Sequence, residues 1–184
     1  GKAFYVSPNQ VKNDRFTLDS FESYHLTNVL RLKTGDNILL LDGIGCGYLA
    51  KVKDTKKTLV SGEIKKKYDF LGENQSEVTI APAIIKPSRF ENMVEKAVEL
   101  GVKKIQPLNL DHSQKKDINS NRLNKIIISA SKQCKRSFFP VLKRPMKLEE
   151  YLDLKYNLVV AGSQKSDSNL TKILLNGFNR KIQI

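Results

Sequence analysis

The stretch KPSRFENMVEKAVELGVKKIQPL, residues 86–108, decides the fold class, because it has the form of one crossover of a parallel sheet. Its apolar residues repeat at i, i+3, i+4, i+7 and i+8, which predicts a helix with one buried stripe. That stripe consists of Phe90, Met93, Val94, Ala97 and Val98. Ser88 and Glu91 fit a capping box at the helix start, and Gly101 fits a left-handed stop. Residues 105–108 then predict the next strand.

The flanking sequence continues the alternation of strands and helices. The apolar run VTIAPAII at residues 78–85 predicts a buried parallel strand before the crossover. The later elements are expected in this order: a helix over 121–136, a short helix over 148–154, a strand over 156–161, a helix over 166–175 and a strand starting at 182–184. This order predicts a parallel α/β sheet with right-handed crossovers.

The N-terminal part has a different pattern. Residues 1–70 carry short strand signals separated by turns, which favours a small β-barrel, so the chain as a whole is α+β. Residues 21–30 predict a short helix, because Phe21, His25, Leu26 and Val29 stand near helical spacing. The turn DGIGCG at 42–47 is followed by a strand, so we interpret it as a hairpin and not as a nucleotide loop. We expect residues 65–74 to be a linker. The predicted domains are therefore residues 1–70 and 75–184.

Positive charge is concentrated in one quarter of the chain. The net charge is +13, with 32 Lys or Arg against 19 Asp or Glu. Residues 103–147 hold 12 Lys or Arg and 2 Asp, whereas residues 1–72 hold 12 Lys or Arg and 8 Asp or Glu. A concentrated positive field suits a nucleic-acid backbone, so we expect the chain to bind nucleic acid.

The second helix of this region supplies the sharpest candidate for that contact. Its polar residues Arg122, Lys125, Ser129, Lys132 and Arg136 follow one another at helical spacing without interleaved acids. We expect the four cations to project from one face toward phosphates, although an ordinary solvated face remains an alternative. The phenylalanines that follow, Phe138 and Phe139, either stack on bases or pack in the core, and packing is favoured.

The sequence contains no residue pattern typical of a metal site, a disulfide framework or a membrane span. Cys46 and Cys134 stand far apart, and the two histidines, His25 and His112, form no ligand cluster with them. We expect a cytoplasmic protein without metal and without a membrane span. Ligands of a parallel sheet bind at the carboxyl ends of its strands. Here those ends are the loops at residues 86–88, 109–116 and 162–166.

Four pieces of the chain resemble segments of one protein family, and they follow one another in the same order as in that family. They are RFENMVEKAVELGVKKIQPL (89–108), DHSQKK (111–116), RLNKIIISASKQCKRSFFP (122–140) and YHLTNVLRLKTGDNILLLDGIGCGYLAKV (24–52). The resemblance is to the RsmE family of ribosomal RNA methyltransferases and covers nearly all of the chain. It implies a PUA-like β-barrel for RNA, then a SPOUT-type α/β domain with a C-terminal trefoil knot.

The resemblance also implies an activity. Members of the family transfer a methyl group from S-adenosylmethionine to ring nitrogen 3 of one uridine in small-subunit (16S) ribosomal RNA. They act on that RNA or on the assembled 30S subunit, as homodimers and without metal. Barrel, parallel sheet and basic face follow from the residues alone, whereas the methyl donor follows only from the resemblance.

Residue roles are carried over from the family at a few positions. Arg31 stands in the V-L-R piece and is expected to meet RNA phosphate. Lys96 and Glu99 stand in the E-K-x-x-E-L-G piece, and Gln133 and Arg136 in the Q-x-x-R piece. RNA contact and structural support are both open for these four.

The donor pocket is expected to lie mostly outside this sequence. The family's G-P-E-G-G loop, and the segment that completes the knot, do not occur among the 184 residues. The resemblance places them after Ile184, so the loop at Ala161 and Gly162 would form one edge of the pocket. Two other hypotheses remain: a non-catalytic RNA-binding protein, and an α/β enzyme for a small phosphorylated substrate.

Overall fold

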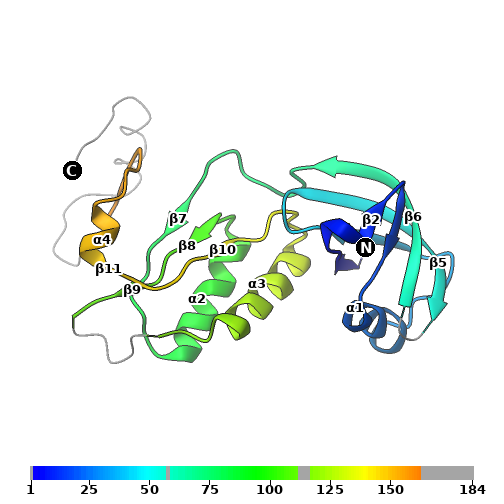
Figure 1. Cartoon of the computed structure of the whole chain (residues 1–184), viewed down its shortest axis with the longest axis horizontal. Coiled ribbons are helices and arrows are strands. Elements are labelled where there is room, and N and C mark those ends of the chain that lie inside the picture. Colours follow the sequence, from blue (N-terminus) through cyan, green and yellow to red (C-terminus); the bar gives the residue numbers. More distant parts are fainter. Residues whose placement is uncertain (1, 57–58, 112–116, 163–184) are drawn as a thin grey trace. The chain divides into compact units, whose positions relative to one another are not determined.

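The computed structural model describes residues 2–56, 59–111 and 117–162. The chain divides into two compact units, residues 1–146 and residues 147–184 (Figure 1). The first unit contains a curled sheet and a smaller α/β part. The second contributes α4 (Leu148–Leu152) and the extended residues that follow it to Gly162. The expected knot, the helix at 166–175, the strand at 182–184 and His112 lie outside the described residues.

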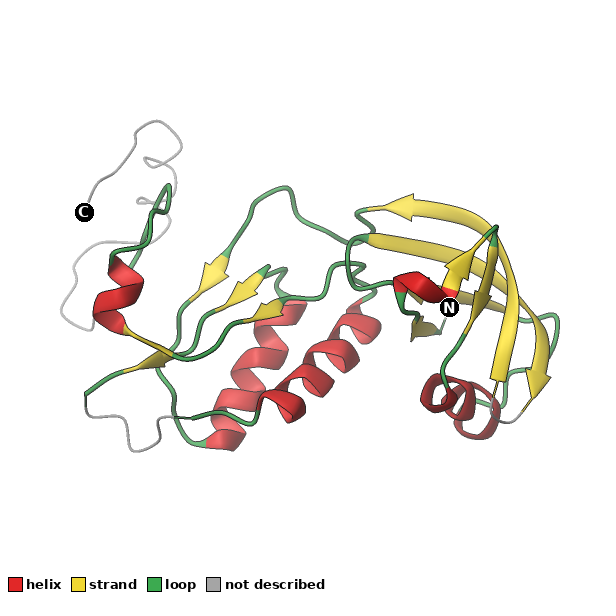
Figure 2. Ribbon diagram, viewed as in Figure 1, coloured by secondary structure: helices red, strands yellow, loops and turns green. Residues whose placement is uncertain are grey.

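The N-terminal part is one six-stranded curled sheet. Figure 2 draws its strands, like all strands of the chain, in yellow. Its strand order is β1-β4-β5-β6-β3-β2. The strands are β1 (Ala3–Tyr5), β2 (Val11–Lys12), β3 (Arg15–Thr17), β4 (Asn37–Leu41), β5 (Cys46–Lys56) and β6 (Leu59–Asp69). All neighbours pair antiparallel except β1 with β4. Alternate residues point inward and bury a core that includes Phe4, Phe16, Leu40 and Val52.

The turn between β4 and β5 is the predicted hairpin. The carboxylate Oδ1 of Asp42 accepts hydrogen bonds from the backbone amides of Ile44 (3.0 Å), Gly45 (3.1 Å) and Cys46 (2.9 Å). Gly45 has a φ of +125°, a conformation that suits glycine. No helix follows this turn, so it offers no helix N-terminus for a phosphate.

The predicted helix at 21–30 forms, with a widened turn in its second half. It consists of α1 (Ser20–Tyr24) and a π-helical segment, η2 (His25–Val29). The amide of Leu30 donates to the carbonyl of His25 at 3.0 Å, so the wider turn shifts later side chains around the axis. Leu26 is buried, whereas Phe21 is 73% exposed and Val29 57% exposed. The apolar residues at helical spacing therefore do not form one buried face.

The α/β part of the first unit has the predicted crossovers. Its three parallel strands, in the order β10-β8-β7, are β7 (Thr79–Ile80), β8 (Lys104–Ile105) and β10 (Val141–Leu142). Two helices, α2 (Pro87–Glu99) and α3 (Ser120–Cys134), connect them and share a core with Ile105 (Figure 1). Short strands β9 (Leu108–Asn109) and β11 (Met146–Lys147) follow. The mixed α/β fold class is confirmed.

Two predicted boundaries are corrected. Residues 156–161 form no strand, and the third parallel strand is β10 instead. Residues 65–69 belong to β6, so the predicted linker is shorter and begins after Asp69. In both cases the short run of residues is compatible with a strand and with a loop. Whether it forms a strand depends on a pairing partner that is distant in sequence.

The ends of α2 show why this helix stops cleanly. Lys86 is the N-cap and Pro87 opens the helix, so the predicted capping box of Ser88 and Glu91 does not form. At the other end Gly101 has a φ of +93°. Its amide bonds to the carbonyl of Val98, and the amide of Val102 bonds to that of Ala97, both at 3.1 Å. This pair of bonds is a Schellman motif, as the glycine predicted.

Candidate nucleic-acid interface

The N-terminal half of α3 presents exposed cations. The side chain of Asn119 caps the helix by accepting from the amide of Arg122 at 3.0 Å. Leu123 and Ile127 are buried against α2, so the opposite face of α3 meets solvent. Lys125 lies on that face and is exposed, and among the described residues it has no ion-pair partner. It is therefore free to meet a phosphate.

Arg122 is exposed too, but it has a carboxylate partner. Its guanidinium binds Glu91 of α2 with two bonds, Nε to Oε1 at 2.5 Å and Nη2 to Oε2 at 2.8 Å. The Arg122 side chain keeps 63% of its surface exposed. The ion pair lowers the pKa of the Glu91 carboxyl. Glu91 thus orients Arg122 across the two helices and does not cap α2.

The C-terminal half of α3 faces the barrel instead of solvent. Lys132 Nζ lies 2.6 Å from Oε1 of Glu22, a residue of α1. The two side chains are only 14% and 3% exposed. Burial raises the pKa of the Glu22 carboxyl above its ordinary value, although the bond to Lys132 opposes that shift. The expectation that Lys132 projects toward RNA is therefore wrong for this arrangement, because the ammonium neutralises a buried acid.

Arg136 is a second correction, because it is 2% exposed. Its Nη1 donates to the carbonyls of Val98 (2.7 Å) and Val102 (3.1 Å), and its Nη2 lies 2.9 Å from Oε2 of Glu73. Lys135 takes a left-handed conformation with a φ of +59° as α3 ends. The chain therefore leaves the helical path before residue 136, and the arginine turns inward.

Glu73 is the centre of this buried cluster. It also accepts from Lys103 and from the backbone amide of Phe138, the latter at 3.0 Å. Burial alone would raise the pKa of the Glu73 carboxyl, but these donors outweigh it and hold the pKa below its ordinary value. The sequence prediction missed Glu73 and Lys103, since their partners lie at least 30 residues away.

The same junction explains the two phenylalanines. The ring of Phe138 lies 5.0 Å from the ammonium of Lys103, and the ring of Phe139 lies 5.4 Å from that of Tyr5. Both are half-buried and packed, as favoured from the sequence. Backbone bonds join the parts further: the amide of Phe139 donates to Gly43 at 2.9 Å. The barrel is therefore bonded to the end of α3.

Replacing Lys132 with methionine is expected to lower the free energy of unfolding at neutral pH by about 2 kcal/mol, because Glu22 then loses its partner. The pKa of Glu22 is already raised, so the folded state binds its proton more tightly than the unfolded state does. Without Lys132 that pKa rises further, and the deficit of the variant shrinks as pH falls from about 7 to about 5. Urea titrations of both proteins at the two pH values check this. A deficit that is constant with pH would contradict it.

The other family-motif positions are spread over the surface. Lys96 and Glu99 form an exposed pair on α2 at 2.9 Å, and Gln133 is exposed on α3. Arg31 is exposed in the barrel, where it follows η2. Ala161 and Gly162 are exposed in the second unit. Among the described residues, none of these side chains shares a hydrogen bond or ion pair with Arg122 or Lys125.

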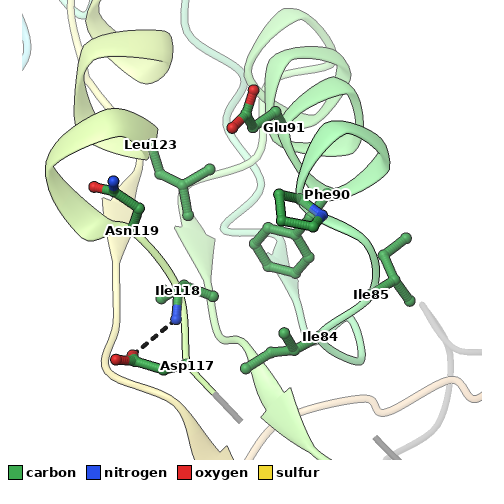
Figure 3. Close-up of a pocket in the computed structure, with 9 residues that line it drawn as sticks. Ile84, Ile85, Phe90, Glu91, Asp117, Ile118, Asn119 and Leu123 are labelled. Atoms are coloured by element: carbon green, nitrogen blue, oxygen red, sulfur yellow. Dashed lines mark hydrogen bonds between the residues drawn. The ribbon is translucent and has the colours of Figure 1, made fainter. Parts of the chain in front are cut away.

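A pocket opens where α2 and α3 begin, at the carboxyl end of β7 (Figure 3). Its floor is apolar, and its rim carries Glu91, Asp117 and Asn119. It holds about 160 Å³, below the roughly 300 Å³ at which small-molecule sites begin. It lies beside the predicted ligand loop at 86–88, but it is too small to enclose a cofactor. Across the described ranges, no cluster of three or more His, Cys, Asp or Glu side chains is arranged to hold a metal.

None of the helices in the described part of the chain combines the length and the apolar content that a membrane span requires.

Known proteins match this chain in sequence over both parts. The model of the RNA methyltransferase domain family matches residues 72–184, and that of the RNA methyltransferase PUA domain matches residues 22–65. A ribosomal RNA small subunit methyltransferase E of Rickettsia conorii is 29% identical over 187 residues, which covers 98% of this chain and 75% of that protein. The protein of that name in Buchnera aphidicola is 30% identical over 159 residues, which covers 83% of this chain and 63% of that protein.

Solved structures share the fold. The ribosomal RNA small subunit methyltransferase E of Neisseria gonorrhoeae, bound to S-adenosyl methionine, superposes with a TM-score of 0.76 at 28% identity. The superposition covers 84% of this chain and 65% of that one. The chain thus spans between 63% and 75% of the length of these three relatives.

Proposed function

This chain belongs to the RsmE family of ribosomal RNA methyltransferases, and we propose that it takes part in methylating small-subunit ribosomal RNA with S-adenosylmethionine as donor. The observation that carries the proposal is the match of residues 72–184 to the RNA methyltransferase domain. The fold supports it, because a curled sheet of the PUA type is bonded to the end of a basic helix.

The finer reaction follows from the family. We propose ring nitrogen 3 of a uridine as the acceptor, in 16S ribosomal RNA or the assembled 30S subunit. The bound donor supplies a methyl group that its sulfonium makes electrophilic. The protein must then hold the acceptor nitrogen in line with that methyl group, and the target base has to leave its stack to get there. A homodimer in the cytoplasm and a domain division at 1–70 and 75–184 complete the proposal.

The residues of this chain contribute mainly to holding the substrates. Lys125 and Arg122 are assigned to phosphates, together with Arg31 of the barrel. Ala161 and Gly162 are assigned to an edge of the donor pocket. Among the described residues, nothing lies within 4 Å of a Cβ added at Gly162.

Reversing the charge of Lys125 is expected to weaken RNA binding by roughly threefold to tenfold near physiological salt, because one phosphate contact is lost. The salt dependence should also become less steep by about one unit of slope in log K against log salt. Filter binding of Lys125→Glu over a salt series measures both. Lys125→Arg is the matched control, because it keeps the charge and should bind as the parent does. Equal affinity for all three proteins would remove Lys125 from the interface.

Calorimetry with S-adenosylmethionine and the full-length protein tests the proposed function. We expect saturable heat with one donor per chain. Saturable RNA binding without any donor heat would instead indicate a non-catalytic RNA-binding protein. The third hypothesis, a small phosphorylated substrate, predicts donor-independent activity that Lys125→Glu leaves unchanged.

A further inference from the structure

The helical segment of the barrel turns two aromatic rings into solvent. Phe21 is 73% exposed and Tyr24 is 56% exposed. Both belong to α1, where residues three apart lie on the same face, so the two rings are neighbours. Large exposed aromatic side chains that are adjacent mark a binding surface more often than isolated ones do.

Arg31 projects from the same segment in an unusual conformation. Its φ is +54°, in the left-handed region that glycine adopts at lower cost. The flanking Leu30 and Leu32 pack against the barrel core, so the side chain between them is directed to solvent. The left-handed turn therefore ends the helical segment with an exposed arginine.

Three cations lie at the C-terminal end of this helical segment. Lys2 reaches the end of η2, where its Nζ lies 3.3 Å from the carbonyl of Leu30, and Lys33 is exposed just beyond. The acids of this segment have partners within the fold. Asp19 accepts the backbone amide of Glu22 and Asp36 that of Lys33, both at 2.8 Å, and Glu22 is buried against Lys132. Two exposed rings on the helical segment and three cations at its C-terminal end suit a chain of bases and phosphates, whereas the cores of protein interfaces are depleted of lysine.

We propose that this aromatic–basic surface, composed of Lys2, Phe21, Tyr24, Arg31 and Lys33, binds an unpaired segment of RNA. Bases stack on Phe21 and Tyr24, and phosphates lie against Lys2, Arg31 and Lys33. Base faces are available to a side chain only where the RNA is unstacked, so the surface selects loops or single strands over duplex. The proposal rests on the proposed function, and it adds the element of the barrel that recognises the substrate.

The test introduces a fluorescent ring, since these 184 residues hold no tryptophan. In the full-length protein Tyr24→Trp places that ring on the surface, and the parent protein supplies the background emission to be subtracted. We expect single-stranded RNA to quench it, and heparin and duplex RNA to bind without comparable quenching. Phe21→Ala and Tyr24→Ala should each lose about tenfold in affinity for single-stranded RNA. Leu100→Ala is the matched control, since Leu100 is an apolar residue of similar exposure, at 78%, and forms the C-cap of α2.

Arg31→Gly separates contact from folding. Glycine accepts a φ of +54° without strain, so the unfolding midpoint should not fall, while the salt dependence of RNA binding should weaken by about one unit of slope. Unchanged affinity for single-stranded RNA in Phe21→Ala and Tyr24→Ala would overturn the proposal. This holds even if the protein methylates RNA, because the proposed function would then stand without this surface. A changed oligomeric state in these variants with unchanged RNA affinity would show a protein contact instead. Quenching by RNA in a protein without methyl transfer would keep this inference and remove the proposed function.

Discussion

Arg136→Ala is expected to lower the free energy of unfolding by about 3–5 kcal/mol, because it leaves the buried carboxylate of Glu73 without its guanidinium partner. The side chains of Arg136 and Glu73 are 3% and 2% exposed, so water cannot take the place of the missing donor. The carbonyls of Val98 and Val102 lose their donor in the same variant. Urea unfolding measures the loss.

Arg122→Ala is the matched control, on the same helix. Arg122 also binds a glutamate with two hydrogen bonds, but its side chain is 63% exposed and water can replace the contact. We expect a far smaller change in stability there. Equal losses in the free energy of unfolding for Arg136→Ala and Arg122→Ala would contradict this account.

The stability difference between the parent and Arg136→Ala is also expected to depend on pH. The pKa of Glu73 in the parent lies below its ordinary value, so the pair stabilises the fold at pH values above the ordinary glutamate pKa and loses that effect as pH falls. In Arg136→Ala the pKa of Glu73 rises, and protonation relieves the buried charge. The gap between parent and variant should therefore narrow on acidification. A gap that widens would show that Arg136 stabilises the fold by some other contact.

Gly62→Ala is expected to destabilise the barrel by about 3 kcal/mol. A Cβ at this position would lie 2.1 Å from the carbonyl oxygen of Lys51 and 2.7 Å from the ring of Phe16. Gly62 pairs with β5 on one side and with β3 on the other, so neither neighbour can withdraw without opening a ladder. Thermal or urea unfolding followed by circular dichroism reports the loss.

Gly162→Ala serves as its control, since no described atom lies within 4 Å of a Cβ added there. We expect this variant to have the same unfolding midpoint as the parent. A Gly62→Ala protein of parental stability would mean that β3, β5 and β6 are not packed as closely as described.

Local patterns predicted those elements whose signals lie within one helix or turn. The apolar stripe of α2 and the stop at Gly101 are both found, because spacing and a left-handed glycine act over a few residues. The hairpin at Asp42 is found for the same reason. The resemblance to the RsmE family is confirmed, and it alone supplied the methyl donor.

The basic stripe on α3 shows where spacing fails. Sequence periodicity places Lys125, Lys132 and Arg136 near one another, but it cannot say which of them meets an acid from a distant segment. Glu22 lies 110 residues before Lys132, and Glu73 lies 63 residues before Arg136. The helix at residues 21–30 is a similar case, because spacing predicts the helix but not that Phe21 and Val29 are exposed while Leu26 is buried. In both cases helical spacing predicted the helix, but it did not predict which side chains the rest of the fold buries.

Methyl transfer itself is the most direct test of the account. The full-length protein is mixed with labelled S-adenosylmethionine and small ribosomal subunits that lack the modification, and the rRNA is then digested to nucleosides. We expect label in 16S rRNA, recovered as 3-methyluridine. The Rickettsia conorii relative, which carries the name ribosomal RNA small subunit methyltransferase E, serves as the positive control. An unlabelled 16S rRNA, in an assay where that relative labels it, would contradict the central claim.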